Sequence, residues 1–299
     1  MSAAFTVLCP VDLSQPSSAP LRYGAAIAAH FGGELVMLAV DDPLLAEAAA
    51  IRHYPPLRIA TEEALTRLAG HAIPALGPEK TRCMAAVGKP AAQIAATATS
   101  IHADLIVMSS HGRRGASKLL LGSTTERVLR ETTTPVLVVP DEHEALTSLA
   151  DPRHGIHRVL APVDLTGWSR PQVAIAAKLA SALSVPLVLA HVVEPVHILD
   201  GSGLDEESLD AWRRAGAEAA LADLARAEAD GADTLVLSGQ PAAEIAATAA
   251  QRNIGLIVMG LHGSGWTRPR LGSVTYRVLC LTQSLVLALP GEGDPPHAA

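Results

Sequence analysis

The chain contains the same series of residues twice, and this internal duplication limits its fold more than any other feature. The matching pairs are VLCPVDL at residues 7–13 with VLAPVDL at 159–165, GKPAAQIAATA at 88–98 with GQPAAEIAATA at 239–249, and Gly122-Ser123 with Gly272-Ser273. The offset between the copies falls from 152 at the first match to 151 at the second and 150 at the third. We therefore expect two tandem domains of about 140 residues each, an ordinary domain size, that differ by small loop insertions and deletions.

Within each copy, short apolar runs alternate with Ala-rich stretches, which is the pattern of strands alternating with helices. In the first copy the expected strands are Thr6–Pro10, Glu34–Val40, Thr81–Val87, Leu105–Met108 and Val136–Val139. The expected helices are Leu21–Phe31, Arg58–Leu76, Pro90–Ser100 and a stretch opened by Gly122-Ser123, with loops at Ser14–Pro20 and around Pro43, Pro55 and Pro56. This alternation predicts an α/β fold in which each domain has a parallel sheet with right-handed crossovers.

Composition sets the expected boundaries of the domains. The first domain is expected at residues 1–140 and the second at 156–292. A polar linker that contains Pro and Gly is expected at 141–155, and a disordered tail at 293–299. In the second copy, a helix at about Glu206–Ala229 is expected to follow the second strand.

Composition also argues against several classes of protein. Hydrophobic residues make up 49% of the chain and aromatic residues only 3%, so the cores have to be built from Ala, Val, Leu and Ile. A formal net charge of −7 argues against general nucleic-acid binding, which favours basic surfaces. Cys9, Cys83 and Cys280 are too few and too scattered for a disulfide framework or a zinc site, and we expect Cys9 and Cys280 to be small core residues. No apolar run reaches about 18 residues and no signal peptide is evident, so we expect a cytoplasmic protein without a membrane partner.

The main candidate binding site lies between the fourth and fifth expected strands. An apolar run ends at Ser109, a basic loop follows, and Gly122-Ser123-Thr124 opens a helix. A glycine at a helix start lets backbone N–H groups approach a ligand, and the helix N-terminus carries partial positive charge. Ser123 and Thr124 add hydroxyl donors. The pattern indicates a phosphate site; the alternative is that Ser123 is an ordinary helix cap.

Other polar residues follow the remaining strands. If the strand order is 3-2-1-4-5, Asp12, Val40, Gly88 and Ser109 all lie at the carboxyl ends of strands, where doubly wound sheets bind ligands. Asp12 either accepts hydrogen bonds from a ribose or an adenine amine, or caps the following loop. Gly88 provides either a close backbone approach or only a strand-to-helix turn. In the basic loop, His111 either donates to phosphate or orients its loop, and Arg113, Arg114 and Lys118 either screen phosphates or form a solvated surface.

Taken together, these residues resemble the universal stress protein family in its tandem two-domain form. The ATP-binding members of that family carry the pattern G-x2-G-x9-G-[ST]. The first copy has Ser109-x2-Gly112-x9-Gly122-Ser123, with the right spacing but Ser in place of the leading Gly. The second copy keeps Gly260-x2-Gly263, but only eight residues separate Gly263 from Gly272-Ser273. The resemblance covers nearly the whole chain.

The resemblance implies a five-stranded Rossmann-like fold in each domain, similar to the adenine nucleotide alpha hydrolases, with ATP as the ligand and Mg²⁺ as the metal that accompanies it. Asp12 and Asp164 would face adenosine, Val40 and Val192 would flank the base, and the Gly loops would hold the phosphates. It also implies that the last strands of the domains pair, Val136–Val139 with about Leu285–Leu289, in an internal pseudo-dimer that could dimerise again. The candidate nucleotide-binding residues are Pro10, Asp12, Val40, Gly88, Ser109, His111, Gly112, Arg113, Gly122, Ser123 and Thr124 in the first copy, and Pro162, Asp164, Val192, Gly239, Gly260, His262, Gly263, Gly272, Ser273 and Val274 in the second.

The two copies are not expected to bind equally well. The first copy keeps the loop length, whereas the shorter loop and Pro269 must alter the loop path in the second. Ser109 would cost about 1 kcal/mol if its backbone needs a positive φ. We therefore expect nucleotide in the first copy before the second.

Three functions fit the sequence. The first is a cytoplasmic ATP-binding stress-response or regulatory protein with little or no turnover, since the sequence has no Walker lysine and no recognisable catalytic triad. The second is a nucleotide-free structural or interaction module of the same fold. The third is an enzyme that transfers adenylyl groups or hydrolyses ATP weakly.

Overall fold

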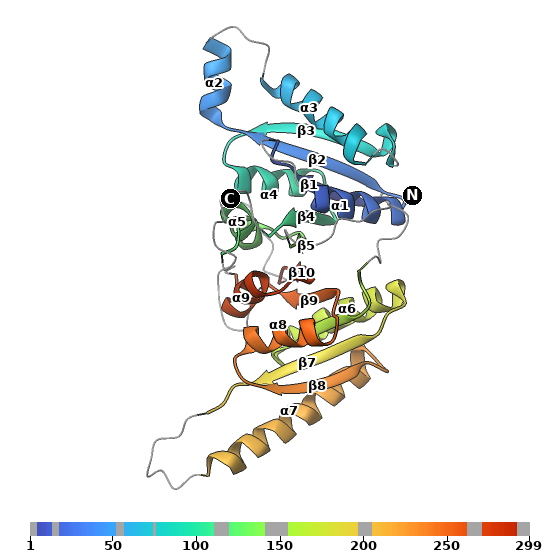
Figure 1. Cartoon of the computed structure of the whole chain (residues 1–299), viewed down its shortest axis with the longest axis vertical. Coiled ribbons are helices and arrows are strands. Elements are labelled where there is room, and N and C mark those ends of the chain that lie inside the picture. Colours follow the sequence, from blue (N-terminus) through green and yellow to red (C-terminus); the bar gives the residue numbers. More distant parts are fainter. Residues whose placement is uncertain are drawn as a thin grey trace. The chain divides into compact units, whose positions relative to one another are not determined.

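The computed structural model describes most of the chain as two compact α/β units, residues 5–140 and 155–291 (Figure 1). The described ranges are 5–13, 18–51, 57–73, 76–110, 120–140, 155–196, 205–261 and 271–291. Gly155, expected in the linker, belongs to the second unit. The rest of the predicted linker and the predicted tail lie outside the described residues.

The first unit is a parallel sheet with helices between its strands. Its elements are β1 (Thr6–Pro10), α1 (Ser18–His30), β2 (Glu34–Asp41), α2 (Pro43–Ile51), α3 (Leu57–Ala72), the 3-10 turn η2 (Pro78–Lys80), β3 (Thr81–Val87), α4 (Pro90–Ser100), β4 (Leu105–Ser109), α5 (Ser123–Glu131) and β5 (Val136–Val139). The strand order is β3-β2-β1-β4-β5, and every neighbouring pair is parallel.

The second unit repeats this topology. Its elements are β6 (Val159–Pro162), α6 (Ser169–Leu183), β7 (Leu187–Val193), α7 (Glu206–Glu228), β8 (Asp233–Ser238), α8 (Pro241–Gln251), β9 (Leu256–Gly260), α9 (Ser273–Leu281) and β10 (Leu285–Leu289). The strand order is β8-β7-β6-β9-β10, again with parallel neighbours. The predicted α/β class with two tandem Rossmann-like domains is confirmed.

The central strands form continuous apolar runs because helices cover both faces of each sheet. In the first unit, Val7, Leu8 and Cys9 of β1 and Leu35–Leu38 of β2 are buried. Helices α1 and α3 pack against each other, and α4 packs against α5. Since the crossovers run one way from β1 to β3 and the other way from β3 to β5, right-handed connections place these two helix pairs on opposite faces.

Both units have one strand pair that separates early. The ladder between β1 and β4 contains only the pairs Val7↔Leu105 and Leu8↔Ile106, whereas the ladder between β1 and β2 contains five pairs. The ladder between β6 and β9 also contains two pairs. These are the points where the strand order reverses, and the strands part there toward their carboxyl ends.

The turn from α1 to β2 depends on two glycines. Gly32 has a φ of 65°, and its N–H donates to the carbonyl of Ala29. A Cβ atom added to Gly33 would lie 1.8 Å from the carbonyl oxygen of Phe5, so no side chain fits there. Helix α1 therefore ends before Gly32-Gly33.

Three predicted boundaries in the first copy were wrong. Helix α1 begins at Ser18, inside the stretch predicted as a loop, because Pro20 lies in the first turn, where its missing N–H is not needed. Helix α3 ends at Ala72 and not at Leu76. The region of Pro43 is the helix α2, which projects beyond the end of β2 (Figure 1).

Helix α2 forms for reasons that are local. Pro43 occupies its first position, and Asp42 Oδ1 accepts a hydrogen bond from the N–H of Leu44 at 2.7 Å, as an N-cap does. Leu44, Leu45 and Ile51 are 73%, 64% and 69% exposed. Among the helices of the described residues, none combines the length and the apolar composition that a membrane crossing requires.

Candidate functional site

The candidate residues of the first unit lie along the carboxyl edge of its sheet. Pro10 is the last residue of β1 and Asp12 follows it, Val40 is the second-last residue of β2, and Ser109 is the last residue of β4. Gly88 directly follows β3. Because all five strands are parallel, these positions share one edge. Asp12 is exposed, and Pro10, Val40, Gly88 and Ser109 are half-buried.

Two hydrogen bonds fix the start of helix α5 to the end of β4, and a third joins that end to β5. The N–H of Ser110 donates to Val139 O at 2.8 Å, and the N–H of Gly122 donates to Ser110 O at 2.8 Å. The buried Thr125 hydroxyl donates to Ser109 O at 2.9 Å. The Gly122 N–H, expected to face phosphate, is therefore already used within the protein.

The amides that remain for a ligand are those of the next three residues. The first bond within the helix runs from the N–H of Glu126 to Gly122 O at 2.8 Å, and no side chain caps the helix at Gly122. The N–H groups of Ser123, Thr124 and Thr125 therefore have no acceptor within the helix. Ser123 is exposed. A helix start of this kind favours an anion through its donors and its partial positive charge.

The second unit reproduces this arrangement at α9. The N–H of Gly272 donates to Leu261 O at 2.8 Å, and the N–H of Tyr276 donates to Gly272 O at 2.9 Å. The buried Thr275 hydroxyl donates to Gly260 O at 2.8 Å. Ser273 is exposed and Val274 half-buried, as Ser123 and Thr124 are. The shorter second loop lies outside the described residues, and it leaves the helix start unchanged.

The serine that replaces the leading glycine of the motif is not strained. Ser109 is the last residue of a strand and is not among the residues with a positive φ; neither is Gly260 in the second unit. The cost considered for a left-handed Ser109 therefore does not arise.

Gly88 and Gly239, in contrast, need to be glycine. Their φ angles are 145° and 139°. An added Cβ would lie 2.9 Å from Gln93 Nε2 in the first unit and 2.7 Å from Glu244 Oε1 in the second. The strand-to-helix turn alone explains both glycines, so their presence gives no separate evidence for a ligand.

Asp164 serves as a cap of its own loop. Its Oδ1 accepts hydrogen bonds from the Thr166 N–H at 3.0 Å, the Thr166 hydroxyl at 2.7 Å and the Ser169 hydroxyl at 3.1 Å. This matches the alternative considered for the Asp in this position. For Asp12, the residues that follow Leu13 lie outside the described part of the chain.

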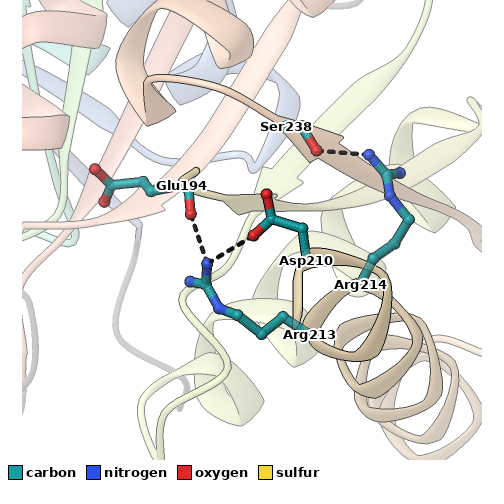
Figure 2. A network of polar contacts seen from close by, with 5 residues as sticks. All are labelled: Glu194, Asp210, Arg213, Arg214 and Ser238. Atoms are coloured by element: carbon teal, nitrogen blue, oxygen red, sulfur yellow. Dashed lines mark hydrogen bonds and ion pairs between the residues drawn. The ribbon is translucent and has the colours of Figure 1, made fainter. Parts of the chain in front are cut away.

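The helix that precedes the third strand, α3 in the first unit and α7 in the second, is anchored differently in the two units. In the first, the Thr61 hydroxyl donates to the carboxylate of Asp41, beside Val40, at 3.0 Å. In the second, two arginines of α7 reach the ends of β7 and β8, just past Val192 (Figure 2). Arg213 Nη1 donates to Glu194 O at 2.7 Å, and Arg214 donates to Val236 O and the Ser238 hydroxyl at 3.2 and 2.5 Å.

Sequence reasoning missed two kinds of residue near this edge. Thr125 and Thr275 fix the helix starts, and their recurrence three residues after Gly122 and Gly272 was the available signal. Gln172 of α6 bridges β6 and β9, and no sequence pattern points to this bridge. Five predicted residues lie outside the described residues: His111, Gly112, Arg113, His262 and Gly263.

Cys9, near the carboxyl edge of the first sheet, has an unreactive thiol. Cys9 is buried in β1 next to Pro10, and burial raises the pKa of its thiol to about 12. It therefore stays a neutral thiol near pH 7 and is not a nucleophile. The expectation that it is a core residue is confirmed, whereas Cys280 is only half-buried in α9.

Comparison with known proteins identifies relatives of both units. The profile of the "Universal stress protein family" matches residues 5–140 and 155–290. The universal stress protein Rv2005c of Mycobacterium tuberculosis is 29% identical over 188 residues, which cover 60% of this chain and 59% of that protein. The chain thus matches less than two thirds of the length of that relative.

Solved structures share the whole fold. A functionally unknown protein of Pseudomonas aeruginosa PAO1 has a TM-score of 0.67 at 18% identity, covering 97% of this chain and 94% of its own. A universal stress protein of Archaeoglobus fulgidus has a TM-score of 0.64 at 23% identity, covering 98% of each chain. At this identity the likeness concerns the fold alone.

Proposed function

Since the chain belongs to the universal stress protein family, with two copies of the family's domain in tandem, we propose that its first unit binds an adenine nucleotide as a regulatory ligand. The observation that carries this proposal is the start of helix α5. Three amides without an acceptor in the helix, those of Ser123, Thr124 and Thr125, follow directly on a hydrogen-bonded connection to β4. Such donors need no reorganisation when a phosphate arrives, so they are preorganised for it.

The remaining edge residues fit the other end of a nucleotide. Asp12 follows the neighbouring strand β1, and a carboxylate there can accept hydrogen bonds from ribose hydroxyls or an adenine amine. Val40 and Gly88 follow along the same edge and offer an apolar side chain and a bare backbone beside the base. ATP is the proposed ligand, and Mg²⁺ would come with its phosphates rather than from a protein site. Within the described residues, no three His, Cys, Asp or Glu side chains are grouped as a metal site would need.

We propose that binding, and not turnover, is the function. The described side chains near the α5 amides supply hydroxyl donors, and none of them pairs a nucleophile with a base. The protein would act in the cytoplasm by changing its partners when nucleotide is bound. Weak hydrolysis would require a base that positions water.

The second candidate function is an interaction module that works without nucleotide. The observation that favours it is the exposed apolar helix α2, with Leu44, Leu45 and Ile51 facing solvent. Exposed apolar groups of this kind are typical of protein contact surfaces.

Calorimetric titration of the full chain with ATP, with and without Mg²⁺, tests the first proposal. We expect saturable binding that AMP matches poorly, because most of the contacts are to phosphate. Mass spectrometry of small molecules released by denaturing the purified protein identifies any nucleotide it carries. Absence of heat with protein shown to be nucleotide-free and folded would exclude nucleotide binding and favour the interaction module. Sustained phosphate release that is lost in Asp12→Ala would instead indicate an enzyme.

A further inference from the structure

The second unit has a side chain at the point where a ligand would have to enter. Strands β6 and β9 pair only at Val159↔Leu256 and Leu160↔Ile257, and beyond these pairs they part. The strand order of the unit reverses there, between β7-β6 and β9-β10. In a doubly wound sheet this is the place for a ligand.

Gln172 bridges the two strands just beyond their last pair. It lies in the first turn of α6, and its Nε2 donates to Pro162 O at 2.7 Å and to Val258 O at 3.0 Å. Pro162 is the last residue of β6, and Val258 lies in β9 one residue after the final pair. An amide nitrogen has two N–H groups, and these two bonds use both. The side chain thus links the two strands where the backbone hydrogen bonds between them have ended.

The first unit has no such group at the equivalent position. The copies align with an offset of 152 from Val7/Val159 to Leu35/Leu187, since both pairs occupy the same register position in their sheets. The residue that corresponds to Gln172 is therefore Pro20, which is buried in α1. Proline has neither an amide nor the length to reach across two strands.

The carboxylate at this edge of the second unit is also held by its own loop. Asp164, the residue expected to face adenosine, already accepts three hydrogen bonds from Thr166 and Ser169 through Oδ1. A ribose would have to compete with these donors for that oxygen. The bridging amide and the capped carboxylate lie on the same edge, one at the strand gap and one just past β6.

We infer that Gln172 closes the nucleotide site of the second unit, so that each chain holds a single nucleotide, in the first unit. The inference rests on the proposed function of that unit. To enter between β6 and β9, a ligand has to break both bonds of Gln172 and leave the carbonyls of Pro162 and Val258 without their donor. The start of α9 keeps its three amides, but they lie beside a closed gap. Gln172 therefore determines which of the two units binds the nucleotide.

Native mass spectrometry of the full chain with saturating ATP counts nucleotides per chain and tests this directly. We expect one for the wild type, two for Gln172→Ala, and one for Gln251→Ala, a control at the exposed end of α8. The reciprocal change Pro20→Gln places the bridging side chain in the first unit, and we expect it to reduce the count to zero.

The outcomes separate this inference from the proposed function. A wild type that holds two nucleotides, or a folded Gln172→Ala that still holds one, overturns the role of Gln172 and leaves nucleotide binding intact. No nucleotide on either protein overturns the proposed function itself. If Gln172→Ala does not fold, calorimetric titration of Ser123→Pro and Ser273→Pro decides: the inference requires weaker ATP binding in the first and wild-type binding in the second, and the opposite result refutes it.

Discussion

The amide of Ser123 offers a way to remove one backbone donor without disturbing the helix. Ser123 is the first residue of α5, where proline is well tolerated because the N–H has no acceptor in the helix. The residue before a proline needs an extended backbone, and Gly122 already has φ −58° and ψ 134°. Ser123→Pro therefore deletes one donor toward the proposed phosphate while the fold accepts the substitution.

The size of the effect follows from the kind of bond that is lost. A hydrogen bond from an amide to a charged phosphate contributes about 1.5–3 kcal/mol. Its removal should therefore raise the dissociation constant for ATP by roughly tenfold to a hundredfold at 25 °C. Thermal unfolding should be nearly unchanged, since no bond within the protein is broken.

Two control variants make the measurement specific. Ser123→Ala removes the hydroxyl but keeps the amide, so we expect a smaller loss in the same calorimetric titration. Ser273→Pro makes the matched change in the second unit, where Gly272 has φ −61° and ψ 143°, and we expect ATP affinity to stay at the wild-type value. If Ser123→Pro binds ATP as tightly as the wild type, or if Ser123→Ala loses as much as Ser123→Pro, the amide is not a phosphate donor and the reasoning fails.

Three further predictions concern the folded framework. Thr125→Val removes the hydrogen bond to Ser109 O and should lower the local stability of α5, measured by hydrogen exchange, by about 1 kcal/mol. Thr275→Val should lower the local stability of α9 by a similar amount and leave α5 unchanged. If either variant destabilises both helices equally, this prediction is wrong. Gly33→Ala must displace the backbone of Phe5 and should cost more than about 3 kcal/mol by thermal denaturation, so a loss below 1 kcal/mol would show that the turn is not tight. Burial raises the pKa of the Cys9 thiol from 9.0 to about 12, so above pH 9 the folded chain keeps a proton that the unfolded chain releases, and the free energy of unfolding should fall by about 1.4 kcal/mol per pH unit up to pH 12. Below pH 9 this contribution is fully present. Cys9→Ala should reduce the dependence of the unfolding free energy on pH by that amount, and an unchanged dependence would show that Cys9 ionises when folded.

The sequence predicts the framework well because the framework depends on local patterns. The buried strands of each sheet are continuous apolar runs, and Thr6–Pro10, Thr81–Val87 and Val136–Val139 coincide with the observed strands. Helix α4 also begins and ends where Pro90 and Ser100 predict. Because each pattern occurs twice in the chain, the strands and helices of both units could be predicted together.

Features that depend on distant partners or on weak local signals were missed. Helix α2 begins with a proline and carries no polar face, so its sequence does not stand out from a loop that contains Pro. The bridge from Gln172 to Val258 joins residues 86 positions apart, and no periodicity reports such a bond. The Gly122 amide was assigned to phosphate because the motif places it at the helix start, but its bond to Ser110 O depends on how the chain returns from the loop.

The two helix starts also show why the Gly-Ser motif alone does not locate a nucleotide. In both units the motif glycine closes a hydrogen bond to the residue after the fourth strand, and the threonine three positions later closes another. These bonds hold the helix against the sheet whether or not a ligand is present, so the fold itself requires this arrangement in each copy. A difference in binding between the copies therefore has to come from other residues. The copies differ in the first turn of the first helix, with Pro20 in one and the bridging Gln172 in the other. This difference, rather than the motif, leads us to expect one nucleotide per chain instead of two.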